Sequence, residues 1–306
     1  MKDIFKQYQL RVIDYSLVFI FTICVCYPLL VHTAMIGAPD YEFHYLRTIG
    51  IVDALKDGQI LPQLSPDAFY GFGYAFSEFY GPVPTYLALF LRLVLGNWIL
   101  AFHFTCFLAV LFSALLFYSL VRKIAKSKKS ESCFSGLFGT IIFLNSITIL
   151  SDIYFQQLFG VLFASCGSIL IFNGLYQIFY REQNYTTNSA KPLGQIISIS
   201  LGAFLCITSH NITTIITIVV CLIFLSLHIT KITIPILKQL GISAVFAVGL
   251  SAFFIFPLLE NIKTGLYNVT NSVYKRNFFQ NSNDAMNSYR RSLTDILHPP
   301  PIASIS

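Results

Sequence analysis

One charged stretch, DYEFHYLR at positions 40–47, places an acid, an imidazole and a guanidinium within eight residues. Asp40 comes just after Gly37 and Pro39, which is the pattern of a helix start with a carboxylate near the positive end of the helix dipole. At about 100° per residue, Asp40, His44 and Arg47 share one helix face, whereas Glu42 points away. The sequence therefore predicts a helix that presents three chemically useful groups together.

These three groups suit the activation of a hydroxyl beside a phosphate. Asp40 can act as a base or bind a divalent cation such as Mg or Mn, His44 can give or take a proton, and Arg47 offers a fork of donors for phosphate oxygens. The alternative is that the charges only anchor the chain in the headgroup region beside a membrane span. Composition decides whether there is such a span.

The 306-residue chain is 55% hydrophobic and only 11% charged, with a mean hydropathy of +0.68. Soluble domains carry about 25% charged residues, so the chain is predicted to be a multi-pass membrane protein. Its apolar runs are continuous rather than alternating, which favours an all-α helical bundle over a β-barrel. Six of the seven cysteines lie inside apolar runs and are interpreted as packing residues. The net charge of +6 is spread over short loops, so no nucleic-acid partner is predicted.

Apolar windows predict seven spans in the bundle. The basic N-terminus MKDIFKQYQLR precedes the first of them and has no cleavage site after it, so we expect a retained span and a cytoplasmic N-terminus. The spans are predicted at 16–36, 99–121, 133–150, 158–179, 194–208, 212–229 and 237–259.

The stretch PVPTYLALFLRLVLG at 82–96 decides the orientation of all later segments. It is short and opens with two prolines, and a re-entrant or interfacial helix there keeps the later basic loops in the cytoplasm. The outer side then receives the loop 37–83, the turns at 151–157 and 208–211, and the end of the chain. We accordingly divide the chain into a transmembrane domain, 1–262, and a polar outer segment, 263–306, which is predicted to be truncated.

Three further residues at span ends or in the aromatic loop are candidates for the same outer site. Tyr80 belongs to an aromatic, glycine- and proline-rich stretch that either forms an interfacial belt or lines a groove where a lipid-linked sugar could lie. Asp152 either caps the next helix or contributes chemistry, and His210 is either an interfacial polar residue or part of the site.

In order and spacing, DYEFHYLR, the aromatic stretch, SDIYFQQLFG and TSHN resemble bacterial membrane proteins labelled 6-pyruvoyl-tetrahydropterin synthase-related. These resemble the wider group of GT-C type glycosyltransferases. The resemblance covers roughly residues 10–260, and matches the family's acid, histidine and arginine to Asp40, His44 and Arg47. It implies sugar transfer from a polyprenyl-phosphate carrier at the outer face of the cell membrane. The supporting positions are Glu42, Tyr80, Asp152, Tyr154 and His210.

The chain departs from the family pattern after Asp152, where Gln156, Leu158 and Val161 stand in place of an arginine, an alanine and a glutamate. Two hypotheses therefore stand side by side. In the first, Asp40 and His44 are catalytic, Asp40 also serves as the metal ligand, and Arg47 binds the donor phosphate. In the second, the chain is a non-catalytic assembly partner or a lipid or solute transporter.

Overall fold

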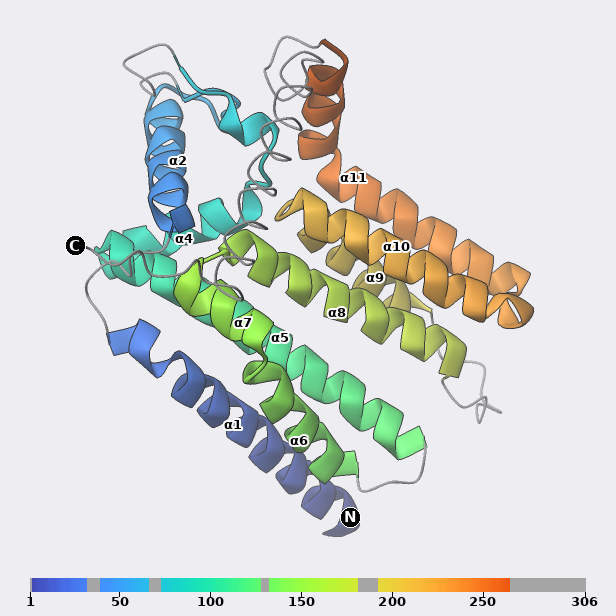
Figure 1. Ribbon diagram of the computed structural model, residues 1–306. Helices are drawn as coiled ribbons and strands as arrows, with labels where there is room; N and C mark the ends of the chain where they lie inside the picture. Colours follow the sequence, from blue (N-terminus) through green and yellow to red (C-terminus); the bar gives the residue numbers. More distant parts are fainter. Residues whose placement is uncertain (1, 32–38, 66–72, 128–131, 181–191, 265–306) are drawn as a thin grey trace, which may run out of the picture. The chain divides into compact units, whose positions relative to one another are not determined.

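The structure is a computed structural model that describes residues 2–31, 39–65, 73–127, 132–180 and 192–264. These ranges are helical apart from short connections, and their extended structure is an isolated antiparallel bridge between Ser65 and Tyr74. Ten α-helices lie in the described ranges: α1 (Lys2–Val31), α2 (Pro39–Lys56), α4 (Val83–Leu95), α5 (Trp98–Ser127), α6 (Ser132–Leu144), α7 (Ile147–Leu150), α8 (Phe159–Tyr180), α9 (Leu193–Ile207), α10 (Asn211–Leu227) and α11 (Ile234–Thr264) (Figure 1).

The all-helical class is confirmed for the described residues, and several helices have the length and composition of membrane spans. Four qualify outright: Arg11–Val31, Trp98–Lys126, Phe159–Tyr180 and Ile234–Lys263. A fifth exists if the bent pair Cys133–Leu144 and Ile147–Phe155 is one span. The predicted spans 194–208 and 212–229 correspond to helices of 15 and 17 residues, which are shorter than the roughly 20 residues that cross a bilayer core. The count of seven spans is not confirmed.

The predicted span at 133–150 is not one straight helix, which corrects the sequence-based expectation. The chain breaks between α6 and α7 and bends by 46°. The Asn145 side chain donates to the Ile141 carbonyl, and the Ser146 hydroxyl accepts from the Ile149 amide, 3.4 Å away, as the cap of α7. Such side-chain bonds to the backbone compete with the helical ladder, so the apolar pattern alone hides the break. Residues 32–36 of the first predicted span lie outside the described residues.

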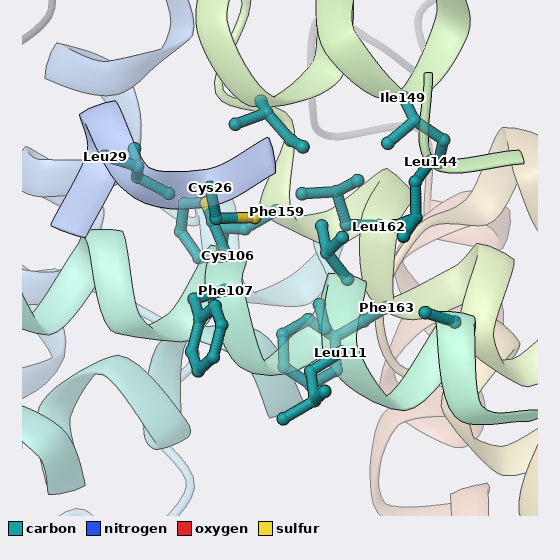
Figure 2. Close-up of a cluster of buried hydrophobic side chains, with 14 of the residues drawn as sticks. Cys26, Leu29, Cys106, Phe107, Leu111, Leu144, Ile149, Phe159, Leu162 and Phe163 are labelled. Atoms are coloured by element: carbon teal, nitrogen blue, oxygen red, sulfur yellow. The ribbon is translucent and has the colours of Figure 1, made fainter. Parts of the chain in front are cut away.

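Helix α5 is the centre of the first part of the bundle, because it packs against α1, α4, α6 and α8 (Figure 1). Figure 2 shows the apolar side chains that meet there, from α1, α5, α6, α7 and the start of α8. Cys26 and Cys106 are buried in this cluster beside Phe159, which agrees with their interpretation as packing residues. Phe159 also takes part in the candidate site described below.

A buried acid ties α1 to its neighbours. The Tyr118 hydroxyl of α5 donates to Asp14 Oδ2 over 2.6 Å, and the Cys133 thiol of α6 donates to Asp14 Oδ1 over 2.9 Å. Asp14 is buried, and a buried carboxylate is tolerated when its oxygens are hydrogen-bonded in this way. The three helices are thus joined by a polar contact as well as by apolar packing.

Helices α8 and α9 pack with their backbones unusually close, through glycines spaced seven residues apart on α8. A Cβ on Gly167 would lie 2.5 Å from the Gly202 carbonyl oxygen, and a Cβ on Gly202 would lie 2.6 Å from the Gly167 carbonyl oxygen. Gly174 faces Gln195 and Ile199 near the start of α9, whereas Gly160 faces Ser209 just beyond its end. The pairing runs in opposite directions along the two helices, so α9 is antiparallel to α8.

The contacts divide the chain inside α11, between Ile255 and Phe256. The boundary that the sequence indicates, at 262/263, falls in the same helix. Of the second unit the structure describes the helical residues 256–264, and the predicted polar segment 263–306 otherwise lies outside the described residues.

Candidate functional site

Helix α2 begins at Pro39, as the sequence predicts, and its first three turns carry Asp40, His44 and Arg47 at the spacing of one helix face. Asp40 is partly exposed in the first turn, while His44 and Arg47 are buried. The side chain of Glu42 lies outside the described residues. The face therefore changes from accessible at the start of the helix to enclosed two turns later.

Arg47 connects α2 to the residues just before and at the start of α4. Its Nη2 donates to the Gly81 carbonyl oxygen over 2.9 Å and to the Thr85 hydroxyl, and its guanidinium lies 5.6 Å from the centre of the Tyr80 ring. Burial lowers the pKa of Arg47 to about 10, so the group keeps its charge at neutral pH. Arg47 thus has a positioning role in the structure, and its predicted contact with a donor phosphate stays a prediction.

The Gly81 segment in turn lies directly on the turn between α9 and α10. The Val83 amide donates to the Thr208 carbonyl over 3.2 Å, and the Asn211 side chain donates to the Phe79 carbonyl over 2.7 Å. A Cβ on Gly81 would lie 2.1 Å from the Thr208 carbonyl carbon. This contact brings together parts of the chain that are more than a hundred residues apart in sequence.

His210 caps α10 from that turn. Its Nδ1 accepts from the Thr213 amide over 3.2 Å and lies 2.8 Å from the Thr213 hydroxyl. Burial lowers the pKa of His210, which favours the neutral ring that can accept at Nδ1. The residue is therefore a helix cap as well as a neighbour of α2.

His44 lies between these elements. Its ring meets the edge of the Phe159 ring at a centroid distance of 4.3 Å, and its Nδ1 is buried without a hydrogen-bond partner among the described residues. Burial, followed by the charges of Arg47 and His210, lowers the pKa of His44 well below its usual value. The ring is neutral at pH 7 and has a nitrogen left to bond.

The other predicted supporting residues divide into two groups. Tyr80 belongs to the site region, since its ring lies 5.1 Å from that of Phe43 and beside Arg47. Asp152 and Tyr154 lie instead in the π-helical turn Ser151–Phe155, where the Tyr154 hydroxyl donates to the Val25 carbonyl of α1. Asp152 is buried inside that turn and does not cap α8, which begins only at Phe159. The capping alternative for Asp152 is wrong.

The divalent cation at Asp40 that the sequence predicts stays a prediction. Protein sites for Mg or Mn draw on carboxylates and other oxygen ligands gathered around the ion, and the described residues contain no group of three or more His, Cys, Asp and Glu side chains placed to hold a metal. A single carboxylate such as Asp40 can still bind Mg together with water and substrate phosphate oxygens.

Three buried polar residues near the site were not predicted from the sequence: Glu78, Gln157 and Ser209. Ser209 lies in the TSHN turn and Glu78 in the aromatic stretch, so the sequence predicted site residues next to them but did not single out these two. Gln157 has a φ of 52°, a backbone conformation that no pattern in the sequence indicates for a glutamine.

The chain is similar in sequence to a bacterial protein. A protein of Lactococcus lactis subsp. cremoris (strain MG1363), described as an uncharacterized protein, is 32% identical over 287 residues. The aligned region is 91% of this chain and 44% of the relative, so the chain spans less than half of that protein's length. No family model matches the chain. No solved structure matches it.

The two lowered histidine pKa values predict a stability that declines in acid. An unfolded histidine titrates near 6.5, so between that value and the lower folded pKa values of His44 and His210 the unfolded chain binds more protons. Stability is fully present above about pH 6.5 and is lost as the pH falls, by at most about 1.4 kcal/mol per pH unit for each group. We expect the unfolding temperature in detergent to fall between pH 7.5 and pH 5.0.

The variant His210→Asn separates this effect from general acid sensitivity, because asparagine keeps a capping side chain and removes one titrating group. We expect His210→Asn to lose less stability than the wild type over the same pH interval. An unchanged pH dependence in both His210→Asn and His44→Gln would contradict the assignment.

Proposed function

We propose that this chain carries the reaction centre of a membrane glycosyltransferase resembling the GT-C type, which takes sugar from a polyprenyl-phosphate carrier. One observation carries the proposal: Asp40, His44 and Arg47 lie on one face of α2, and the Gly81 segment and the turn of His210 pack around that face. Several helices have the length and composition of membrane spans, and a polyprenyl-phosphate carrier resides in the membrane as well. The chain spans less than half of its Lactococcus lactis relative, so the activity of a protein of that full length is also part of this proposal.

The transfer needs a base for the acceptor and a means of releasing the donor phosphate. The acceptor hydroxyl oxygen attacks the anomeric carbon of the sugar, and its proton passes to the Asp40 carboxylate. The bond from that carbon to the phosphate oxygen breaks, and the electron pair leaves with the polyprenyl phosphate. Asp40 suits the role of base because it is the accessible member of the face.

His44 and Arg47 would support this step from the enclosed part of the face. Neutral His44 can accept or donate a hydrogen bond as the proton moves. Arg47 retains its positive charge, and a fixed cation near the leaving phosphate lowers the energy of the charge that develops there. Because Arg47 Nη2 is bonded to Gly81 and Thr85, we assign to Arg47 a fixed electrostatic contribution and the positioning of α2.

The test is a transfer assay with the full chain in proteoliposomes, using tritiated hexoses on short polyprenyl phosphates and an oligosaccharide acceptor mixture. We expect Asp40→Asn to reduce transfer to background, since an amide cannot take the proton. Asp53→Asn is the matched control, because Asp53 lies on the same helix in a pair with Lys56, 2.9 Å away. Full activity in Asp40→Asn would refute the assignment of the base.

Two other results would favour the competing hypotheses. If the wild-type chain transfers no sugar from any donor but co-purifies with a second membrane protein, a non-catalytic assembly role is favoured. If it moves labelled carrier or solute between the leaflets without transfer, a transporter is favoured. Neither is favoured by a specific observation in the structure.

A further inference from the structure

Four buried polar side chains around the candidate site have an atom that finds no hydrogen-bond partner among the residues that the structure describes. They are His44 (Nδ1), Glu78 (Oε2), Gln157 (Nε2) and Ser209 (Oγ), and their exposed fractions are 7%, 7%, 3% and 4%. Unsatisfied buried groups lower stability unless a ligand or water completes them, so a gathering of four calls for an explanation.

The four come from different segments that are in contact with one another. The His44 ring packs on Phe159, and the Phe159 amide donates to the Gln157 carbonyl over 3.0 Å. A Cβ on Gly160, the next residue, would lie 2.9 Å from the Ser209 carbonyl oxygen. The segments that carry His44, Gln157 and Ser209 are therefore in contact with one another.

Glu78 joins this neighbourhood from the other side. The residue after it, Phe79, accepts a hydrogen bond from the Asn211 side chain over 2.7 Å, and Gly81 lies against Thr208 and Ser209. Arg47, one turn beyond His44, donates to the Gly81 carbonyl. The segment of Glu78 is thus bound both to α2 and to the turn that carries Ser209.

Gln157 provides an independent sign that this neighbourhood is built for a ligand. Its φ of 52° lies in the left-handed region, and among the described residues no other non-glycine residue has a positive φ. Such a conformation costs free energy in a residue with a side chain and is concentrated at ligand-binding sites. The glutamine side chain is buried.

The four side chains bring acceptors and donors together. The Glu78 carboxylate accepts, the Gln157 amide nitrogen donates, and the Ser209 hydroxyl and the His44 ring can do either. A phosphate would need donors alone and would be repelled by the carboxylate, whereas a sugar hydroxyl both donates and accepts. We propose that Glu78, Gln157, Ser209 and His44 form a subsite that binds the hydroxyl groups of the saccharide on a lipid-linked ligand. This inference rests on the proposed function and names the residues that select the sugar.

The experiment compares two soluble probes on the full chain in nanodiscs: farnesyl phosphate, and farnesyl phosphate carrying glucose, galactose, mannose or N-acetylglucosamine. We expect the wild type to bind at least one of the sugar-bearing probes more tightly than farnesyl phosphate. Glu78→Gln and Ser209→Ala should weaken that probe about tenfold or more, the loss typical of a hydrogen bond to a charged or enclosed group. The affinity for farnesyl phosphate should stay within about twofold.

Ser251→Ala is the matched control, because Ser251 on α11 is also a buried serine whose hydroxyl finds no partner among the described residues. It should leave both affinities unchanged, and unfolding temperatures should show that each variant is folded. If the wild type prefers a sugar-bearing probe and the site variants keep that preference, the subsite is refuted and the proposed function stands. If the wild type shows no preference at all, the subsite and the sugar-transfer function both fail.

Discussion

Gly81→Val is expected to leave little correctly folded protein and to separate α2 from the turn that carries His210. A Cβ at position 81 would lie 2.1 Å from the Thr208 carbonyl carbon, 2.2 Å from its oxygen and 2.5 Å from the Ser209 nitrogen. These are backbone atoms, so no side-chain rotation can relieve the clash, and the two segments must move apart. The hydrogen bonds of Val83 and Asn211 across the same contact would then be lost.

We expect Gly81→Val to lower the free energy of unfolding by about 3 kcal/mol or more, which is the upper range for overpacking combined with lost hydrogen bonds. The measurement is the thermal unfolding midpoint and the monodisperse yield in mild detergent. Gly249→Ala is the control, since a Cβ there meets nothing within 4 Å and alanine is the better helix former. A Gly81→Val protein as stable as the wild type would show that the two segments are not in contact.

The second large effect is expected at the glycine contact between α8 and α9. In Gly167→Val, the Cβ alone would lie 2.5 Å from the Gly202 carbonyl oxygen and 3.0 Å from the Cys206 nitrogen, and the two methyl groups need more room still. Helices in lipid associate through close backbone packing at small residues, so the pair must separate along its length. We expect a loss of about 3 kcal/mol or more.

The measurement is again the thermal unfolding midpoint and the monodisperse yield in mild detergent. Gly241→Ala is the control, because a Cβ at position 241 meets nothing within 4 Å. A cysteine pair placed across α8 and α9 should also cross-link less efficiently in the Gly167→Val background. Unchanged stability together with unchanged cross-linking would mean that α8 and α9 are held apart from one another in the membrane.

The local features of the site were predictable from the sequence because they depend on neighbouring residues. The helix start near Pro39 follows from turn and dipole preferences, and the shared face of His44 and Arg47 follows from the helical period. What the sequence did not supply was the partner of that face. The hydrogen bonds from Arg47 to the segment of Gly81 join residues 34 and 38 positions apart, and no local pattern encodes such a pairing.

The fold shows the same division between local and distant information. Apolar windows found the positions of the helices, since lipid selects for long apolar segments. They did not show the break at Asn145 and Ser146, because two small polar residues hardly change the mean hydropathy of a window while their side chains compete for backbone bonds. The cytoplasmic position of the N-terminus stays a prediction.

His210 illustrates why a residue's presence at a site differs from its task there. Grouping the outer turns predicted that it would face the same side as the charged loop, and the structure places it near His44. Its ring, however, is also the cap of α10, a task that the sequence does not suggest because histidine is not a common cap. A variant such as His210→Ala would remove both the cap of α10 and the ring at the site, whereas His210→Asn keeps a capping side chain and is therefore the more informative variant.

The seven-residue spacing of Gly160, Gly167 and Gly174 on α8 has a consequence for how this chain can change over evolution. A repeat of seven keeps contact with a second helix only if the two helices coil gently about each other. These glycines therefore set the register of α9 against α8, and with it the position of Ser209 and His210, which follow the end of α9. A substitution at Gly167 or Gly174, away from the candidate site, would therefore shift the positions of Ser209 and His210. Substitutions at these glycines would thus disrupt the site, although no residue of the site itself had changed.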